Sequence, residues 1–263
     1  MKIGIFDSGI GGLSVLHLAR KMMPHAEFVY YADEKHVPYG EKTVEAIRGF
    51  VEEILYFLIE QKVDAIVIAC NTATSVANKE FREKFPVPIV GMEPAVKMAV
   101  EHQHEKGKRI LVAATPVTIA GDKLHLLLER VDKNHEADLV SLPKLVRFAE
   151  KGDFETSEID AYLQAELRRF DLAQYEAVVL GCTHFNYFKE NFRRVFPVTV
   201  HFVDGNEGTI RQLMRVLGQV DAQEEEARVR KITYYFSGIP VTEAERKKVE
   251  EYLHQLDKMA EIS

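Results

Sequence analysis

Short runs of Val, Ile, Phe and Tyr alternate with longer stretches in which apolar residues recur every three or four positions along this chain of 263 residues. The short runs predict strands, and the longer pattern predicts amphipathic helices, most clearly in Lys42–Lys62. Alternation of this kind is typical of parallel sheets with helices packed on both faces. The strands predicted in the first part of the chain are Lys2–Phe6, Glu27–Ala32, Ala65–Ala69 and Ile89–Gly91.

The second half of the chain repeats the first. Three runs in the first half have counterparts further on, at offsets of 107, 112 and 111 residues, so the register holds across three predicted strands. The second pair is the most telling, because it places a cysteine at the same strand end in each copy. The matched runs are Lys2–Ser8 with Arg109–Thr115, Asp64–Cys70 with Glu176–Cys182, and Val87–Glu93 with Val198–Asp204.

This repeat predicts an α/β fold with two similar parallel-sheet lobes, related by internal pseudo-symmetry, and an active site in the cleft between them. The charged stretch 101–108 is the expected link between the lobes. The tail from about Asn206 adds a helix, an acidic turn at Glu224–Glu226, a strand at Ile232–Phe236, and a last helix whose start carries a capping box from Thr242 to Glu245. Because such a tail is expected to pack back on the first lobe, the predicted domains are 1–97 with 207–263, and 98–206.

Composition narrows the classes of function. A net charge of −7 argues against a dedicated nucleic-acid surface and against adsorption to an anionic membrane. No segment approaches the ~20 apolar residues that span a bilayer, and the first residues read as a strand and not as a secretion signal. The expected location is therefore the cytoplasm, where Cys70 and Cys182 are expected to be free thiols, because their wide separation fits neither a disulfide framework nor a zinc site.

Polar and flexible residues stand at four predicted strand ends, where parallel α/β sheets bind their ligands. The glycine turn at 7–12 lacks the third glycine of a dinucleotide site, since Ser14 occupies that position, so a small carboxylate is as plausible a guest as a phosphate. Taken singly, Cys70 is more often a small buried hydrophobe than a catalyst, and His184 beside Cys182 is as easily structural as functional. The fourth strand end, before Asp33, on its own indicates only a loop.

Taken together, the repeated thiols indicate more. Two facing half-domains would bring Cys70 and Cys182 to opposite walls of one cleft, with Asp7 beside the first thiol and His184 beside the second. This arrangement suits a reaction in which one face of a carbon loses a proton and the other face gains one. A thiol, with an ordinary pKa of about 8.5, is suited to acid and base work near neutral pH. A hydrolase with a nucleophilic cysteine needs only one such thiol.

At this point the motifs resemble those of bacterial glutamate racemases, in the aspartate/glutamate racemase family. The resemblance rests on Asp7–Gly12, Tyr30–Gly40, Ala69–Thr72 and Gly181–His184, which occur in the family's order and spacing. It implies interconversion of L- and D-glutamate to supply peptidoglycan synthesis, with no cofactor and no metal, by a homodimer.

The resemblance also implies a role for each matched residue. Cys182, assisted by His184, corresponds to the base that acts on L-glutamate. Cys70, with Asp7 nearby, corresponds to the base that acts on D-glutamate. The pairs that correspond to substrate-binding residues, and two further acidic residues of the site, are Asp7 and Ser8, Tyr39 and Gly40, Asn71 and Thr72, Thr183 and His184, and the acidic residues Asp33 and Glu150.

The sequence departs from the family pattern directly after His184, where Phe185, Asn186 and Tyr187 replace the Tyr-Pro of relatives. This departure puts the packing of that loop in question and leaves the two thiols in register. Three other readings stay open from the residues: a racemase for another amino acid such as aspartate, a hydrolase or lyase that uses a single thiol, and a module that binds a small anion.

Overall fold

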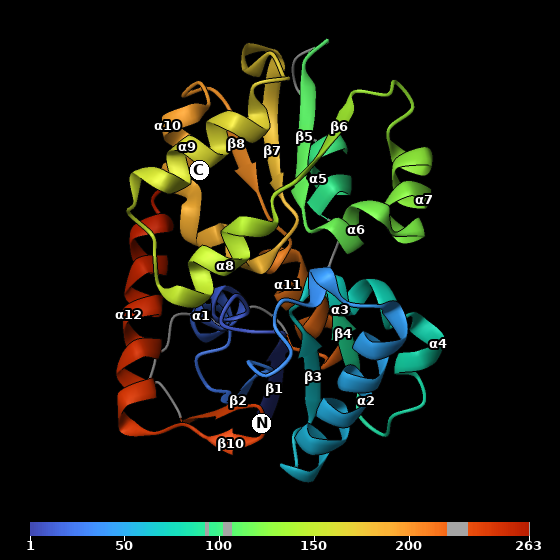
Figure 1. Cartoon of the computed structure of the whole chain (residues 1–263). Helices are drawn as coiled ribbons and strands as arrows, with labels where there is room; N and C mark the ends of the chain where they lie inside the picture. The colour runs from blue at the N-terminus through green and yellow to red at the C-terminus, as the bar shows by residue number, and fades with distance from the viewer. Residues whose placement is uncertain (93–94, 102–106, 220–230, 263) are drawn as a thin grey trace.

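The strands lie in two sheets, which occupy the lower and upper halves of Figure 1. A computed structural model describes residues 1–92, 95–101, 107–219 and 231–262. We call the part built on the six-stranded sheet the first lobe and the part built on the four-stranded sheet the second lobe. In order across each sheet, the strands are β10 (Ile239–Pro240), β9 (Ile232–Phe236), β2 (Glu27–Ala32), β1 (Lys2–Asp7), β3 (Ala65–Ile68) and β4 (Ile89–Gly91) in the first lobe, and β6 (Ala137–Ser141), β5 (Arg109–Ala114), β7 (Tyr175–Leu180) and β8 (His201–Val203) in the second.

The strand order confirms the internal repeat. The order β2-β1-β3-β4 of the first lobe is the same as the order β6-β5-β7-β8 of the second, and all these pairs are parallel. The register agrees as well, because Ile3 pairs with Ala65 and its counterpart Ile110 pairs with Ala177. These partners have the offsets that the first two sequence matches predict, so Cys70 and Cys182 follow equivalent strands.

The third sequence match is wrong by two positions. Ile89 pairs with Ile66, whereas the equivalent Val178 pairs with Phe202, two residues later than the alignment predicts. The reason is a turn in the second lobe, closed by a backbone hydrogen bond of 3.1 Å to the carbonyl of Pro197, which delays the start of β8. Apolar pattern alone did not separate this turn from the strand that follows it.

Apolar side chains on the two faces of each sheet meet different helices. In β1, Ile3 and Ile5 belong to a buried cluster that continues into the second lobe, whereas Phe6 faces a cluster formed largely with the long helix at 44–60. The alternation follows from the two-residue period of a strand. The helices are α1 (Leu13–Met22), α2 (Val44–Glu60), α3 (Asn71–Val76), α4 (Lys79–Arg82), α5 (Ala95–Glu101), α6 (Pro116–Ala120), α7 (Asp122–Val131), α8 (Pro143–Lys151), α9 (Ser157–Leu167), α10 (Lys189–Val195), α11 (Asn206–Val216) and α12 (Glu243–Met259), with 3-10 helices η1 (Tyr39–Glu41), η2 (Leu172–Gln174) and η3 (Thr183–Phe188).

The tail returns to the first lobe, as the sequence predicts. Strand β9 pairs with β2 in the six-stranded sheet, and α12 begins with the predicted capping box between Thr242 and Glu245. Helix α12 also packs against α1 and η3, so it runs beside both lobes (Figure 1). The domain boundaries stay a prediction, and residues 102–106 of the expected link and the acidic turn at 224–226 lie outside the described residues.

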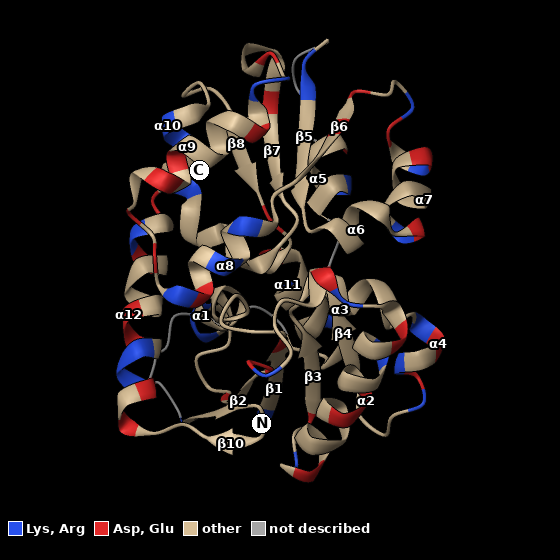
Figure 2. Cartoon of the chain, viewed as in Figure 1, with Lys and Arg blue, Asp and Glu red and all other residues tan. Residues whose placement is uncertain are grey.

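Most of the charged residues in the described ranges are exposed or half-buried. Figure 2 shows Lys and Arg interspersed with Asp and Glu along α12, while the strands of both sheets are mostly uncharged in this view. No helix in the described ranges combines the length and apolarity that crossing a bilayer requires.

Candidate active site

The glycine turn after β1 holds the buried carboxylate of Asp7. Asp7 is fully buried, and its Oδ1 accepts a hydrogen bond of 3.0 Å from the amide of Gly9. The hydroxyl of Tyr30 donates to the Gly9 carbonyl at 2.7 Å, which fixes the turn from the neighbouring strand. A Cβ atom on Gly12 would lie 2.5 Å from the Asp7 Cβ, so only glycine allows α1 to begin this close to the strand end.

Cys70 follows β3 and caps the first turn of α3. Its Sγ accepts from the Ala73 amide at 3.4 Å and lies 3.5 Å from the hydroxyl of Ser8, to which the thiol donates. The side chain is buried, and burial, with the nearby Asp7 carboxylate, raises the pKa of the Cys70 thiol to about 12. This thiol therefore keeps its proton at neutral pH in the structure described, so it is poised as an acid.

Cys182 follows β7 and is paired with His184 in η3. The Cys182 Sγ lies 3.7 Å from Nδ1 of His184, and Nε2 of the same ring lies 2.6 Å from Oε1 of Glu150. Burial opposes a charge on His184, but the hydrogen bonds to Cys182 and Glu150 outweigh it and raise the pKa of the imidazole well above its ordinary value. A protonated imidazole favours a thiolate beside it, so His184 is placed to support Cys182.

The glycine turn after β1 and the loop of Cys182 are in direct contact. The Thr183 hydroxyl donates to Asp7 Oδ2 at 3.0 Å, and a Cβ atom on Gly11 would lie 2.4 Å from His184 Nδ1. Burial raises the pKa of the Asp7 carboxyl, against the opposing effects of His184, the Gly9 amide and the Thr183 hydroxyl. The loop after β1 in the first lobe and the loop after β7 in the second are therefore one connected unit.

Glu150, one of the two further acidic residues that the resemblance implies, lies within this unit. Its Oε1 accepts from the Ile10 amide at 3.0 Å and from His184 at 2.6 Å, so a single carboxylate oxygen joins α8 to the glycine turn and to η3. A Cβ atom on Gly9 would lie 1.9 Å from this oxygen. The close approach explains why the turn carries glycine at this position as well.

Thr72 lies in a cluster of hydroxyl groups that also joins the lobes. Its Oγ1 is 3.0 Å from that of Thr115 and 3.4 Å from that of Thr118, and Thr115 packs against Gly40. Sequence reasoning did not select Thr115 or Thr118 as site residues. The repeat contained a signal for Thr115, because it is the counterpart of Ser8 at the end of β5.

The remaining predicted residues, Asp33 and Asn71, are hydrogen-bonded to neither thiol within the described ranges. Asp33 is buried and accepts a hydrogen bond of 2.6 Å from the Tyr39 hydroxyl and one of 2.9 Å from His36, so it anchors the turn that carries Tyr39 and Gly40. Asn71 opens α3 and lines a mainly apolar cavity of about 350 Å³ between α5 and α7. In the part of the chain that the structure describes, no group of three or more His, Cys, Asp and Glu side chains is arranged to hold a metal ion.

Comparison with known proteins gives a consistent result. Residues 14–213 match the family model described as Asp/Glu/Hydantoin racemase. A glutamate racemase from Lachnospira eligens is 47% identical over 265 residues, which cover 100% of both chains. Among solved structures, a glutamate racemase from Campylobacter jejuni superposes with a TM-score of 0.83 at 28% identity, covering 97% of this chain and 98% of that one. A glutamate racemase from Francisella tularensis in complex with D-glutamate gives 0.80 at 26% identity, covering 96% and 93%.

The fold and the paired thiols thus define an isomerase built from two α/β lobes. The chain belongs to the Asp/Glu/Hydantoin racemase family, and the full-length similarity places it with the glutamate racemases of that family.

Proposed function

We propose that this chain interconverts L- and D-glutamate by a two-base mechanism in which Cys182 and Cys70 exchange the α-proton with opposite faces of the substrate. One observation carries the proposal: the thiols stand at equivalent ends of β3 and β7, and each has its own polar partners, Ser8 for Cys70 and His184 for Cys182. Full-length similarity to glutamate racemases, among them one crystallised with D-glutamate, supports glutamate as the substrate.

In the direction from L-glutamate, the Cys182 thiolate removes the α-proton and becomes a thiol. The electron pair of the broken C–H bond stays on the substrate, shared between the α-carbon and its carboxylate. The Cys70 thiol then gives its proton to the opposite face and becomes a thiolate, which leaves D-glutamate. The reverse reaction starts from the Cys70 thiolate. The proton-bearing Cys70 and the His184 that supports a thiolate at Cys182 fit the starting state for L-glutamate.

The main barrier is the charge that develops on the substrate carboxylate when the weakly acidic α-proton leaves. Donors fixed in advance around that charge are the largest source of stabilisation in many enzymes. We assign this role to the Asn71 amide and the Thr72 hydroxyl. The hydroxyls of Ser8 and Thr183, which donate to Asp7 in the structure described, would join them by turning from Asp7 to the substrate. Tyr39 and Gly40 would close the pocket, because Asp33 fixes the Tyr39 hydroxyl and Gly40 packs against Thr115 of the other lobe.

The role that follows is the supply of D-glutamate for peptidoglycan. The proposal needs no cofactor, since both proton transfers use side chains of this chain. A homodimer in the cytoplasm is the expected form, and Cys70 and Cys182 are free thiols, as a reducing compartment would keep them.

The test follows the circular dichroism of each enantiomer of glutamate and of aspartate with the purified chain and no added cofactor. Decay of both glutamate signals toward zero is the expected result. Decay with aspartate alone would replace the proposed substrate, and decay with neither amino acid would overturn the proposal. Deuterium from D₂O should enter the α-position of glutamate during the reaction. Binding of glutamate without this exchange would instead identify a module that binds a small anion.

A further inference from the structure

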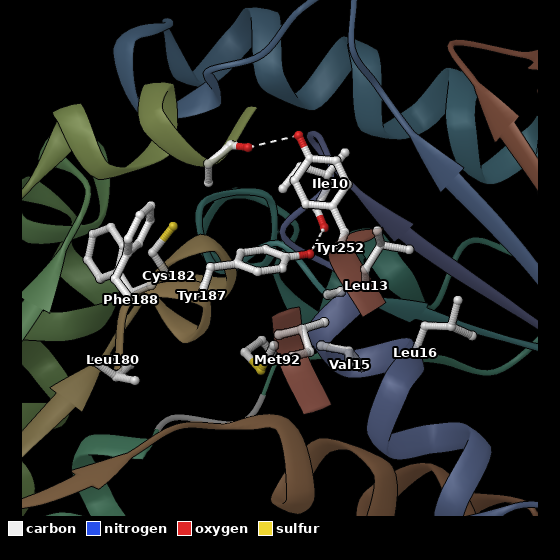
Figure 3. Close-up of a cluster of buried hydrophobic side chains, with 14 of the residues drawn as sticks. Ile10, Leu13, Val15, Leu16, Met92, Leu180, Cys182, Tyr187, Phe188 and Tyr252 are labelled. Atoms are coloured by element: carbon white, nitrogen blue, oxygen red, sulfur yellow. Dashed lines mark hydrogen bonds between the residues drawn. The ribbon is translucent and has the colours of Figure 1, made fainter. Parts of the chain in front are cut away.

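Tyr187 joins the loop of Cys182 to the glycine turn after β1, whose Ser8 accepts a hydrogen bond from the Cys70 thiol. Its hydroxyl donates a hydrogen bond of 2.9 Å to the carbonyl of Ile10 in the glycine turn, and both residues are fully buried. Figure 3 shows the Tyr187 ring extended from the side of Cys182 toward Ile10, with this bond drawn as a dashed line. The bond crosses from the second lobe to the first, and it lies outside the set of residues assigned to the reaction above.

The Ile10 residue is held on both sides by the second lobe. Its amide donates to Glu150 Oε1 at 3.0 Å, and its carbonyl accepts from Tyr187. The next residue, Gly11, lies directly against Thr183 and His184, where a Cβ atom would come within 2.5 and 2.4 Å of their polar atoms. The position of Ile10 therefore sets how the turn that carries Asp7 and Ser8 meets the loop of Cys182.

Tyr187 itself is held in place from several directions. It follows His184 by three residues in η3, and side chains three apart in a 3-10 helix point to the same side. The Asn186 amide donates to the Thr183 carbonyl at 3.3 Å, which stiffens this short helix. The Tyr187 ring packs against Phe154 at 5.2 Å between ring centroids and against Tyr252 at 5.6 Å. The packing of the ring therefore fixes the direction of the hydroxyl toward the Ile10 carbonyl, and the side chain keeps little conformational freedom.

The protonation state of the hydroxyl suits a permanent donor. Burial, with the nearby Tyr252, Glu150 and Asp7, raises the pKa of Tyr187 well above its ordinary value. The hydroxyl therefore keeps its proton near neutral pH and remains a donor to the Ile10 carbonyl.

From these contacts, and resting on the proposed two-thiol reaction, we infer that Tyr187 is a positioning residue that keeps the Cys70 side of the cleft in register with Cys182. It touches neither thiol, and it acts through Ile10 and the glycine turn. Its contribution is to the second proton transfer: the carbanion formed by Cys182 meets the Cys70 thiol only while the glycine turn, which contacts Cys70 through Ser8, is held against the loop of Cys182.

The test compares Tyr187→Phe with the wild-type chain in D₂O, starting from L-glutamate. At early times the α-deuterated L-glutamate, formed when Cys182 returns a solvent deuteron to the same face, is measured against the D-glutamate formed. The ratio of the two products does not depend on how much enzyme is folded, so a purely structural role for Tyr187 leaves it unchanged. Nuclear magnetic resonance with a chiral derivative gives both amounts.

In Tyr187→Phe the ratio of retained to inverted product should rise about 10-fold, and kcat should fall by a similar factor while KM changes less, since small misplacements of reacting groups are costly. The control is Tyr235→Phe, which loses a hydroxyl bond of 3.0 Å to Gln61 far from the cleft and should keep the wild-type ratio. A wild-type ratio in Tyr187→Phe would overturn the inference. If the wild-type chain itself does not racemise glutamate, the proposed function fails first, so the two failures are distinguishable.

Discussion

The Thr183 hydroxyl donates to the Asp7 carboxylate at 3.0 Å, although the two residues belong to different sheets and are 176 positions apart in the sequence. Asp7 ends β1, and Thr183 follows the thiol at the end of β7. Because Asp7 also raises the pKa of Cys70, one carboxylate influences the first thiol and is hydrogen-bonded to the loop of the second. Several consequences of this link are measurable.

Asp7→Asn should make Cys70 easier to ionise. Burial is the larger cause of the raised pKa of Cys70, and the charge of Asp7 adds to it, so removing that charge lowers the pKa from about 12 without restoring the ordinary value. In a Cys182→Ser background, the rate of alkylation of Cys70 by iodoacetamide against pH should shift to lower pH. In the otherwise wild-type chain, Asp7→Asn should nevertheless slow racemisation. The single amide oxygen of asparagine cannot take the place of both carboxylate oxygens, which accept from the Gly9 amide and from the Thr183 hydroxyl. An unshifted alkylation profile would contradict the role given to Asp7.

The serine variants of the two thiols should lose racemisation and keep different halves of the exchange reaction. Cys70→Ser leaves Cys182 and His184 in place, so it should still exchange the α-proton of L-glutamate with solvent. Cys182→Ser should exchange only D-glutamate. In each variant, racemisation should fall by at least about 10³-fold, because a serine hydroxyl is a poor acid and base near neutral pH. Full racemisation by either variant would indicate a single-thiol mechanism.

The hydrogen bonds of His184 to Cys182 and Glu150 should make the folded chain less stable as the pH rises. The pKa of His184 is raised in the folded state, so its stabilising effect is complete below the unfolded pKa of about 6.5 and is lost as the pH rises toward the folded pKa. Between pH 7 and 8.5 the free energy of unfolding in urea should fall by at most about 1.4 kcal/mol per pH unit from this one proton.

His184→Gln is the control for this pH dependence, since it cannot gain the proton. It should have a flatter profile over the same pH interval, even if it is less stable throughout. Equal slopes in the two proteins would show that another group titrates.

Alanine at Gly11 should abolish activity, whereas alanine at Gly49 should be harmless. A Cβ atom on Gly11 would lie 2.4 Å from His184 and 2.5 Å from Thr183, so the turn or the catalytic loop must move. On Gly49, within α2, a Cβ atom meets nothing within 4 Å. Gly49→Ala should raise the free energy of unfolding by about 0.5–1 kcal/mol through the helix preference of alanine, with kcat unchanged.

The measurements for this pair are urea unfolding and the initial rate of racemisation. Activity within twofold of wild type in Gly11→Ala would mean that the two loops are less tightly packed than described.

Much of the fold could be predicted because the same order of apolar strands and polar strand ends occurs twice in the sequence. The strand ends at Cys70 and Cys182 could be predicted because an apolar run stops at a polar group in each copy. The residues that the repeat matches also have equivalent pairing partners in the two sheets. The start of β8 could not be predicted, because the turn after Pro197 is as apolar as the strand that follows it.

The contacts between residues of the site were harder to predict from the sequence than the positions of the two thiols. Local pattern places Asp7 and Thr183 at strand ends, but it contains nothing about which ends meet across the cleft. Thr118 and Tyr187 contribute through contacts with the opposite lobe, which a single sequence does not reveal. Glu150 could be named from the family resemblance, but the physical reason for its place in the site comes only from the structure. There it accepts hydrogen bonds from Ile10 and His184.

Helix α12 has a consequence for how the protein is made. The Tyr252 hydroxyl donates to the carbonyls of Ala149 and Glu150, and Gln255 donates to the carbonyl of Tyr187, so this helix supports the catalytic loops of the second lobe from behind. The ribosome synthesises it after every thiol, carboxylate and hydroxyl of the site. A nascent chain that already contains both cysteines therefore still lacks the hydrogen bonds that hold the carbonyls of Ala149, Glu150 and Tyr187, and it gains them only when the residues of α12 have been added.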